Sequence, residues 1–468
     1  MQKILKRSLR GERGYSPSSL TLFYTFQPSR REFYRQIVGV QKNSNEVIIM
    51  KIGVIGLGIV GLAITASALE KGHEVVVVDI DENLVQDYER RIEEVNVNDD
   101  DIHRVELLLL KMNRDRLHLS SHYDEDTFEG VHHYMICTES SVFVSVVESL
   151  RDYINPGDVI VIESTVTPKD VKVFMNVLFE GKNINSLFDF HLIVSPERVM
   201  EGKLVYNFRS LDKVVGVMTD EAWEKAEALY RGIGVQGELH RSTINESAIS
   251  KLVENTYRYW NITLANLVSD ICNDTVSCSF ERVRELVNSC PWRDLMLSGL
   301  GIGGPCLSEN IAMLYEHAMC YTLDGMRLLK DVQTYNEVRT SMYIPEAILN
   351  DIRRAGYDLE NINICVFGAA YRPEGVSTIN SPALTISYEL SKDVKSVFMY
   401  DPKCIGDEMS WEDCVSKSQV VLLLVPHSKL VSDFETAMMK YRKQLYINLT
   451  QVQYDDIQEG VKYVWHPI

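Results

Sequence analysis

Two short segments of the chain carry residue types that could do redox chemistry together. The first is a dinucleotide-binding pattern, Gly56-Leu57-Gly58-Ile59-Val60-Gly61, and the second places a cysteine after glycines, Gly301-Ile302-Gly303-Gly304-Pro305-Cys306. A nicotinamide cofactor alone carries an alcohol only to an aldehyde. A thiol can hold that aldehyde as a thiohemiacetal, allow a second hydride transfer and leave a thioester for water to cleave. The pair therefore predicts a dehydrogenase that oxidises an alcohol through to a carboxylic acid.

The glycine pattern lies where a dinucleotide site requires it, after an expected strand over 51–56 and before an expected helix. Gly56 permits the tight turn, Gly58 lets the backbone approach the pyrophosphate, and Gly61 allows close packing of helix on strand. Asp79 ends the next expected strand, where its carboxylate can accept hydrogen bonds from the ribose hydroxyls. Its charge would repel a 2′-phosphate, so NAD is favoured over NADP. The cofactor-binding residues expected here are Gly56, Gly58, Ile59, Val60, Gly61 and Asp79.

Cys306 has two interpretations on local evidence. A cysteine is commonly a small buried hydrophobic residue. Glycines and a proline surround this one, however, and a helix is expected from about Ser308, whose N-terminus would lower the thiol pKa. The residues around Cys306 leave the nucleophile and the core residue as alternatives.

A long helix expected over 246–271 carries a polar stripe. Lys251 and Asn255 are four positions apart and Arg258 follows three later, so these residues lie on one face. The neighbouring positions are largely apolar, and a polar stripe on a buried helix is costly unless it lines a site. A solvated face is the alternative.

The composition limits the class of partner. The chain has 468 residues, and its formal net charge of −18 argues against nucleic acid, because phosphate binding needs a positive field. Its nine cysteines are scattered without a CxxC pair, which predicts a reducing compartment, the cytoplasm, without a disulfide framework, zinc site or other metal. No run approaches 18 consecutive apolar residues, so no membrane span is expected.

The first 49 residues differ from the rest. They contain nine Lys and Arg against three Asp and Glu, with several serines and no sustained period. We expect a basic extension that is either disordered or not part of the native protein, in the second case because an upstream start codon was chosen in error. A transit peptide has a similar composition and is the alternative.

Strand and helix patterns alternate along the rest of the chain. Expected strands at 51–56, 74–78, 134–137, 159–162 and 192–194 predict a parallel, doubly wound sheet.

After the long helix, a helical stretch over 326–352 leads into a second α/β unit, with strands at 364–367, 397–400 and 420–425 and a helix at 382–390. The expected fold class is α/β, with two Rossmann-like doubly wound domains joined by a long central helix and a helical middle domain. The expected boundaries are 1–49 for the extension, 50–240 for the NAD-binding domain, 241–345 for the central helical domain with the cysteine, and 346–468 for the C-terminal domain.

Longer motifs follow one another from Met50 to the C-terminus. They are MKIGVIGLGIVG, ESTVTP (163–168), SPERVMEGK (195–203), KLVENTYRYWNITLAN (251–266), GIGGPCLSEN (301–310), VFGAAYRPEGVSTINSPAL (366–384) and LLVPH (423–427). In sequence and order they resemble the UDP-glucose/GDP-mannose dehydrogenase family, the NAD-dependent nucleotide-sugar 6-dehydrogenases. The resemblance implies oxidation of a CH2OH group to a carboxylate with reduction of two NAD, giving a precursor of cell-surface polysaccharide.

The resemblance also implies a role for each matching residue. Cys306 would be the nucleophile, and Lys251 would stabilise the developing oxyanion. Asn255 would hydrogen-bond the sugar or the same oxygen, while Thr165 and Glu201 would position or activate the hydrolytic water. The C-terminal domain would hold the nucleotide. Residues expected at the substrate are Glu197, Arg198, Lys251, Asn255, Arg258, Gly303 and Arg372, with Thr138 and Thr165 at the cofactor.

The sugar is a finer question. Glucose-type members usually carry Phe after the SPE motif, where this chain has Arg198. The runs 254–266 and 291–297 are similar to members that act on UDP-N-acetylhexosamines. UDP-N-acetylmannosamine or UDP-N-acetylglucosamine is therefore favoured, with UDP-glucose second. The family and the long helix also suggest a homodimer through that helix.

Four positions depart from the family pattern. Asn310 stands where the family has an aspartate that holds the catalytic lysine and water, so a negative charge is lost. Ile379 stands where an arginine is expected to bind anionic groups, Thr138-Glu139 replaces Thr-Pro, and Leu267 replaces Glu.

These departures raise an alternative of another class, a catalytically impaired homologue that binds NAD and a nucleotide sugar. The retained Cys306 and Lys251 favour the enzyme, because a purely binding role gives no reason to keep the thiol and the lysine.

Overall fold

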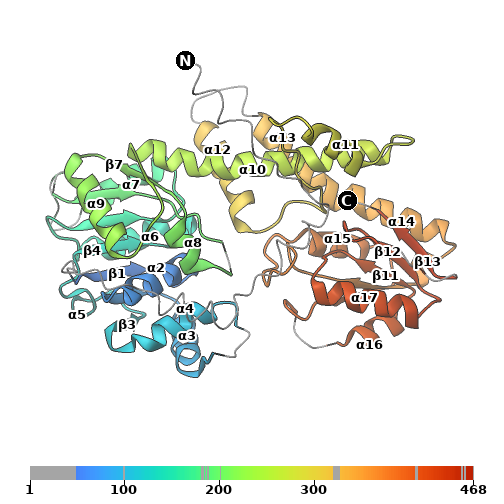
Figure 1. Cartoon of the computed structure of the whole chain (residues 1–468), viewed down its shortest axis with the longest axis horizontal. Coiled ribbons are helices and arrows are strands. Elements are labelled where there is room, and N and C mark those ends of the chain that lie inside the picture. Colours follow the sequence, from blue (N-terminus) through green and yellow to red (C-terminus); the bar gives the residue numbers. More distant parts are fainter. Residues whose placement is uncertain are drawn as a thin grey trace, which may run out of the picture. The chain divides into compact units, whose positions relative to one another are not determined.

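The computed structural model describes most of the chain from residue 49 onward (Figure 1). The described residues are 49–466 apart from 98–100, 181–183, 185, 187–188, 201, 320–326, 406–408, 455–456 and 458–459. The basic extension expected over 1–49 thus lies outside the described residues except for Ile49, and Glu201 lies outside them as well.

The first α/β unit is built on an eight-stranded sheet in the order β3-β2-β1-β4-β5-β6-β7-β8. Its strands are β1 (Lys51–Ile55), β2 (Glu74–Val78), β3 (Leu117–Ser120), β4 (His133–Ile136), β5 (Val159–Ile162), β6 (His191–Val194), β7 (Lys213–Val217) and β8 (Leu239–Ser242). All neighbouring pairs are parallel except β6 and β7. The central strands are almost entirely buried, as expected for a parallel sheet covered on both faces.

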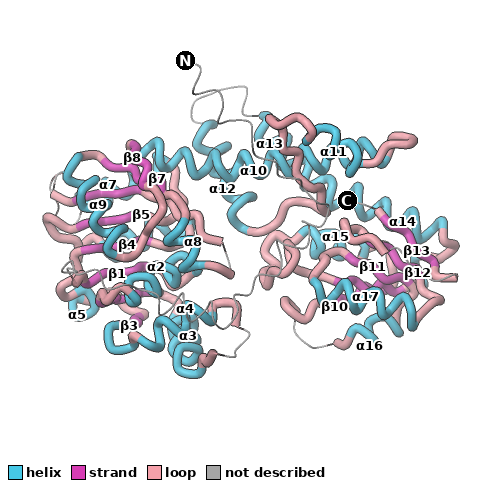
Figure 2. Tube along the Cα trace, in the orientation of Figure 1, coloured by secondary structure: helices cyan, strands magenta, loops and turns pink. Residues whose placement is uncertain are grey.

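Helices connect the strands of this sheet, so the doubly wound arrangement expected from the alternating pattern is confirmed. They are α2 (Ile59–Glu70), α3 (Glu82–Glu94), α4 (Arg104–Met112), α5 (Glu125–Phe128), α6 (Phe143–Leu150), α7 (Pro168–Phe179), α8 (Leu204–Ser210) and α9 (Asp220–Gly232). Figure 2 shows this alternation of helix and strand along the chain.

The middle of the chain is helical, with α10 (Ile244–Asn273) as its longest element. A capping box starts α10, because the Thr243 hydroxyl accepts from the Glu246 amide and the Glu246 carboxylate accepts from the Thr243 amide. The following helices are α11 (Phe280–Asn288), α12 (Pro305–Met319), α13 (Arg327–Val338) and α14 (Ile344–Arg354). Helix α12 packs along α10. The stretch expected as helix over 326–352 is interrupted by a π-helical turn at Arg339–Tyr343.

The second α/β unit has five parallel strands in the order β10-β9-β11-β12-β13. They are β9 (Asn363–Phe367), β10 (Ser396–Tyr400), β11 (Val420–Leu423), β12 (Leu445–Asn448) and β13 (Lys462–Trp465), with helices α15 (Pro382–Leu390), α16 (Trp411–Ser416) and α17 (Ser428–Lys440). Apolar residues of the strands and helices form cores on both faces of the sheet.

The expectation that the chain lacks disulfides is wrong for one pair. Cys365 on β9 and Cys414 on α16 form a disulfide, with 5.6 Å between their Cα atoms. Both side chains are fully buried in the second unit. Their wide separation in sequence gave no sign of the pairing, because only the packing of α16 brings the two thiols together.

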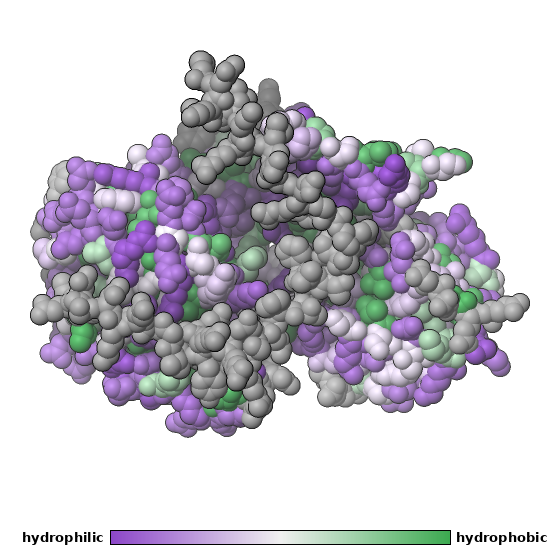
Figure 3. Space-filling view, viewed as in Figure 1, coloured by the Kyte–Doolittle hydropathy of each residue, from purple (hydrophilic) through white to green (hydrophobic). Residues whose placement is uncertain are grey.

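No described helix has the length and the apolar character that a membrane span needs. On the face drawn in Figure 3, the described surface is mainly hydrophilic, and its apolar residues form small separate groups.

Candidate active site

The glycine loop and Asp79 lie side by side because β1 and β2 run in register. Ile55 pairs with Val78, so the residues that follow each strand meet at one edge of the sheet. The amide of Gly56, at a φ of 102°, donates to the Val78 carbonyl at 2.8 Å. Asp79 Oδ2 accepts from the Leu57 amide at 2.7 Å. The carboxylate therefore fixes the backbone of the loop just before α2.

The start of α2 has the features of a site for a dinucleotide. Gly58 is the N-cap, the described side chains do not cap it, and the first turn contains no acidic residue. A Cβ at position 58 would meet nothing within 4 Å, whereas one at Gly61 would lie 1.9 Å from the Gly56 carbonyl oxygen. Open space over free helix N–H groups suits a pyrophosphate, so these residues fit NAD. The half-buried Val60 and the exposed Ile59 form the first turn.

Thr138 adds a second sign of a ligand at this edge. Its methyl group would lie 3.1 Å from a Cβ at Gly56, so the side chain is beside the glycine loop. Its hydroxyl oxygen is buried and has no hydrogen-bond partner among the described residues. A buried hydroxyl without a partner is costly, and a bound polar group would satisfy it.

The packing of α12 on α10 brings Cys306 close to Lys251. Cys306 is exposed, and it lies inside the first turn of α12, which starts at Pro305 rather than near Ser308. Partial desolvation raises the pKa of the thiol above its ordinary value, and Glu309 adds to this while the Lys251 ammonium opposes it. Desolvation therefore outweighs the lowering expected from the helix N-terminus, and the net direction of the pKa shift is upward.

The Lys251 ammonium places a positive charge near the Cys306 thiol. Lys251 is half-buried, and burial lowers its pKa against the opposing charges of Glu254, Cys306 and Glu197. The amide Nδ2 of Asn255, one turn further along α10, donates to Asn310 Oδ1 on α12 at 2.6 Å.

Asn310 is buried, with 2% of its surface exposed. Its bond to Asn255 orients both amides. An aspartate at this position could accept the same hydrogen bond and would add a negative charge.

Glu197 lies in a buried charge network that sequence reasoning missed. Its carboxylate accepts from the ammonium of Lys213, which also lies 3.6 Å from Glu163. The Tyr230 hydroxyl donates to Glu163 Oε1 at 2.7 Å. Burial raises the pKa of Glu163 to about 7, Glu197 adds to this, and Lys213 opposes it. The one available signal was a charged residue at the end of each buried strand, Glu163 after β5 and Lys213 opening β7.

The remaining expected residues lie in several places. Arg198 forms an ion pair at 2.8 Å with Glu254, which lies three residues after Lys251 on α10, and Thr165 is half-buried in the segment after β5. Arg258 is exposed on α10. Arg372 Nε donates to the hydroxyl of Tyr371 at 3.2 Å.

The loop that precedes Cys306 packs against the segment that follows β9. The Gly304 amide, at a φ of 80°, donates to the Ile379 carbonyl at 2.9 Å. A Cβ at Gly303 would lie 2.7 Å from both the Asn380 carbonyl oxygen and the Tyr371 Cβ, so no larger residue fits there. The backbone of residue 379 makes this contact, and an isoleucine supplies it as well as the arginine expected at that position.

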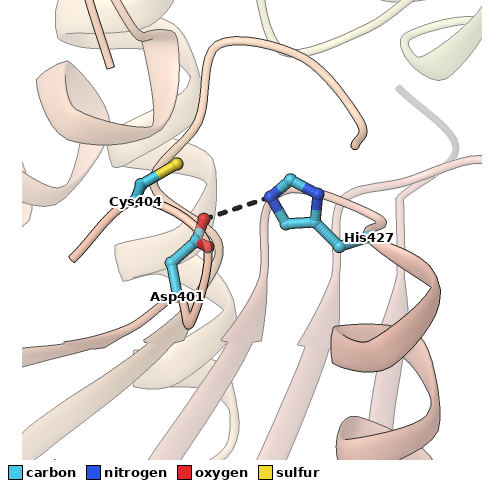
Figure 4. A group of neighbouring side chains, drawn as sticks. All are labelled: Asp401, Cys404 and His427. Atoms are coloured by element: carbon cyan, nitrogen blue, oxygen red, sulfur yellow. Dashed lines mark hydrogen bonds and ion pairs between the residues drawn. The ribbon is translucent and has the colours of Figure 1, made fainter. Parts of the chain in front are cut away.

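Asp401, Cys404 and His427 gather at the carboxyl edge of the second sheet (Figure 4), with potential ligand atoms within 4.8 Å of one another. His427 Nδ1 accepts from the Glu374 amide at 2.8 Å, so the neutral ring carries its proton on Nε2. That nitrogen lies 3.1 Å from Asp401 Oδ2, to which it donates. The ring has no lone pair left for a metal ion, and the cluster instead holds the loop around Glu374.

Asp401 is ionised by its surroundings. Burial acts to raise its pKa, but hydrogen bonds from His427 and from the amides of Ala369 and Lys403 hold that pKa at about 2. The pair of Asp401 and Ala369 at the ends of β10 and β9 repeats the arrangement of Asp79 and Leu57 in the first sheet.

These features define an NAD-dependent oxidoreductase: a glycine loop on a doubly wound sheet, the Asp79 carboxylate that holds this loop, and the Cys306 thiol near the Lys251 ammonium. Residues 50–234 match the NAD binding domain of the UDP-glucose/GDP-mannose dehydrogenase family, and residues 245–338 match the central domain of the same family. The chain belongs to this family, and NAD is its cofactor.

The similarity to named relatives covers most of the chain. It is 27% identical over 402 residues to the UDP-N-acetyl-D-mannosamine dehydrogenase of Methanococcus maripaludis, covering 81% of this chain and 86% of that protein. It is also 27% identical over 374 residues to the UDP-glucose 6-dehydrogenase AglM of Haloferax volcanii, covering 75% and 83%. In fold it is similar to the UDP-D-ManNAc dehydrogenase of Pyrococcus horikoshii, with a TM-score of 0.77, 24% identity, and coverage of 89% and 99%.

Proposed function

We propose that the protein oxidises the C6 hydroxymethyl group of a UDP-sugar to the carboxylate, with Cys306 as the covalent nucleophile. The observation that carries this proposal is the exposed Cys306 thiol in electrostatic contact with the Lys251 ammonium. The glycine loop over Asp79, with its open helix N-terminus, is the complementary half of the machinery.

The reaction is the loss of two hydrides and the gain of one water. NAD, when bound, supplies the acceptor for each hydride. The alcohol loses a hydride and a proton to give the aldehyde, and the sulfur of Cys306 then adds to the aldehyde carbon to form a thiohemiacetal. A second loss of hydride and proton leaves the thioester, and water cleaves its C–S bond to release the carboxylate and restore the thiol.

Lys251 and Asn255 act on the oxygen that becomes negative during these steps. The ammonium of Lys251 stabilises the oxyanion, and the Asn255 amide, oriented by Asn310, hydrogen-bonds the sugar or the same oxygen. Thr165 and Glu201 position the hydrolytic water. Since the pKa of Cys306 is raised, its proton must leave as sulfur attacks, and the forming alkoxide is its acceptor.

The nucleotide sugar lies between residues of both α/β units in this proposal. Glu197, Arg198 and Arg258 come from the first unit and α10, Gly303 from the cysteine loop, and Arg372 from the second unit, which holds the UDP group. The relative from Methanococcus maripaludis favours UDP-N-acetylmannosamine, one of the two UDP-N-acetylhexosamines preferred from Arg198 and the runs 254–266 and 291–297. UDP-N-acetylglucosamine is next, and the relative from Haloferax volcanii keeps UDP-glucose as the alternative.

The exposed face of α10 supports a homodimer. Its exposed apolar residues recur at intervals of three, four or seven and form one stripe about 80° wide; they are Ile249, Val253, Tyr257, Leu264, Leu267 and Ile271. Lys251 and Asn255 lie on roughly the opposite side of the helix. A second copy of the chain would cover this stripe, and a charge introduced at Val253 should then shift the mass in solution from dimer to monomer.

The catalytically impaired homologue remains the second candidate, because Asn310 and Ile379 remove two charges that the family pattern contains. Both candidates bind NAD, so NADH formation separates them.

A panel of UDP-sugars tests the proposal. The purified protein is mixed with NAD and the UDP forms of N-acetylmannosamine, N-acetylglucosamine, glucose and galactose, with GDP-mannose as an outlier, and NADH absorbance is followed. The proposal expects turnover with an N-acetylhexosamine form and a lower kcat/KM with UDP-glucose. Turnover with GDP-mannose alone would contradict the proposal. If the protein binds NAD but forms no NADH with any of these sugars, the result would favour the impaired homologue.

A further inference from the structure

Arg339 is buried, and each of the three nitrogens of its guanidinium group donates a hydrogen bond. Only 1% of its side chain is exposed. Nε lies 2.9 Å from Asp270 Oδ2 and Nη2 lies 3.0 Å from Asp270 Oδ1, a two-pronged ion pair with α10. Nη1 donates to the carbonyl oxygens of Gly299 and Leu300 at 2.6 and 2.5 Å. A buried charge is costly unless it is paired in this way, so the side chain has one well-defined position.

The two carbonyls open the loop that ends at Cys306. The amide of Gly299 donates to Asn266 Oδ1 of α10 at 2.9 Å. Asn336 of α13 accepts from the Ile302 amide at 2.8 Å and donates to the Ile302 carbonyl at 3.3 Å. The backbone from 299 to 302 is therefore held by side chains at both of its ends.

The space around Gly301 leaves no room for a side chain. A Cβ at Gly301 would lie 2.6 Å from Thr340 Cγ2 and 3.0 Å from Asn336 Oδ1. Arg339 and Thr340 open the π-helical turn between α13 and α14. Turns of this kind insert a residue into a helix and are frequent at functional sites, where they direct a side chain that a regular helix would place elsewhere.

We propose that Arg339 is a positioning residue, which sets the place of the Cys306 thiol by holding the start of its loop. Asp270 keeps the guanidinium in place, and the Tyr335 hydroxyl, which also donates to Asp270, orients that carboxylate. The substrate aldehyde carbon must meet the sulfur at bonding geometry, and a displacement of about 1 Å can cost roughly 100-fold in rate. The inference rests on the proposed function, because it takes Cys306 as the nucleophile.

Arg339→Lys tests the inference, because a lysine keeps the positive charge toward Asp270 but cannot hold both loop carbonyls in the same geometry. We expect kcat to fall by roughly 100-fold, with KM and the NAD dissociation constant within about threefold of wild type. The rate of iodoacetamide reaction at Cys306 should change in the same variant. Guanidinium ion added to Arg339→Ala should restore part of kcat, whereas ethylammonium should not.

Arg209→Lys is the matched control. Arg209 forms a partly buried ion pair with Glu70 and donates to the Ser67 hydroxyl at 2.7 Å, within the first α/β unit. It should lose thermal stability without the loss of kcat. If Arg339→Lys proves insoluble, Asp270→Asn removes the charge partner of Arg339 at a side chain, that of Asp270, which is itself 33% exposed, and a similar fall of kcat is expected.

A wild-type kcat in Arg339→Lys, or an equal fall in Arg209→Lys, would overturn the inference. The outcome is separable from failure of the proposed function. A Cys306→Ser variant that is inactive beside a fully active Arg339→Lys refutes only the positioning role, while an active Cys306→Ser refutes the nucleophile itself.

Discussion

Replacing Gly58 by alanine separates the fold of the glycine loop from its use. Gly58 has a φ of −75° and a ψ of −171°, which alanine adopts without strain, and a Cβ there meets nothing within 4 Å. Alanine is a poorer N-cap, at a cost of about 0.5–1 kcal/mol. It also restricts the unfolded chain, which stabilises by about 0.4–1 kcal/mol. The melting temperature should therefore stay within about 3 °C of wild type.

The affinity for NAD should respond quite differently to Gly58→Ala. If the pyrophosphate lies on the N–H groups that start α2, the new methyl group occupies the position of closest approach and lengthens those hydrogen bonds. Hydrogen bonds to a charged group are worth about 1.5–3 kcal/mol each. Weakening one of them should raise the NAD dissociation constant by roughly 10- to 100-fold.

Isothermal titration with NAD and thermal unfolding of the apo protein measure the two effects. Gly61→Ala is the comparison, because its Cβ would lie 1.9 Å from the Gly56 carbonyl oxygen and must push α2 away from β1. Overpacking of this kind costs about 1–3 kcal/mol, so this variant should lose both stability and NAD affinity. Wild-type NAD affinity in Gly58→Ala would refute the placement of the pyrophosphate, and a fall in melting temperature as large as in Gly61→Ala would refute the geometry.

Three further predictions concern charges in and near the site. Asn310→Asp should keep the hydrogen bond from Asn255, raise the pKa of Lys251 and increase kcat by about tenfold. A variant of unchanged stability with a lower kcat would contradict the role given to a negative charge at position 310. Because the pKa of Cys306 is raised, the rate of its alkylation by iodoacetamide should keep increasing at alkaline pH. Lys251→Met should shift this pH–rate profile to still higher pH, because the ammonium lowers the thiol pKa. An unchanged profile in Lys251→Met would contradict the electrostatic interaction. The folded-state pKa of Asp401, about 2, lies below its ordinary value, so its stabilisation is present above pH 4 and lost as pH falls toward 2. In denaturant titrations across that range, Asp401→Asn should lose about 2 kcal/mol less than wild type, and equal losses would contradict the prediction.

Much of the fold was predictable because the central strands are continuous apolar runs. The strands at 74–78 and 159–162 and the helix at 382–390 have the bounds expected from the sequence. Five strands were not anticipated: β7, β12 and β13, and the two edge strands of the first sheet, β3 and β8. Both edge strands are four residues long and carry exposed polar residues, so they show no apolar run, and pairing with β2 and β7 is what makes them strands.

The site was predictable where its residues lie in one motif or on one helix face. The positions of Cys306, Lys251 and Asn255 followed from local spacing and family resemblance. The network around Lys213 and the ion pair of Arg339 did not, because their partners come from distant segments that only the packed structure brings together. The direction of the Cys306 pKa escaped prediction for a related reason, since desolvation depends on all the neighbours of the sulfur and the helix N-terminus is only one of them.

The most direct test of the account is the yield of NADH per UDP-sugar consumed, measured for the wild-type protein and for Cys306→Ser. The account predicts two NADH per sugar for the wild type, and no turnover but unchanged NAD binding for Cys306→Ser. Two NADH per sugar at an undiminished rate in Cys306→Ser would contradict the covalent route.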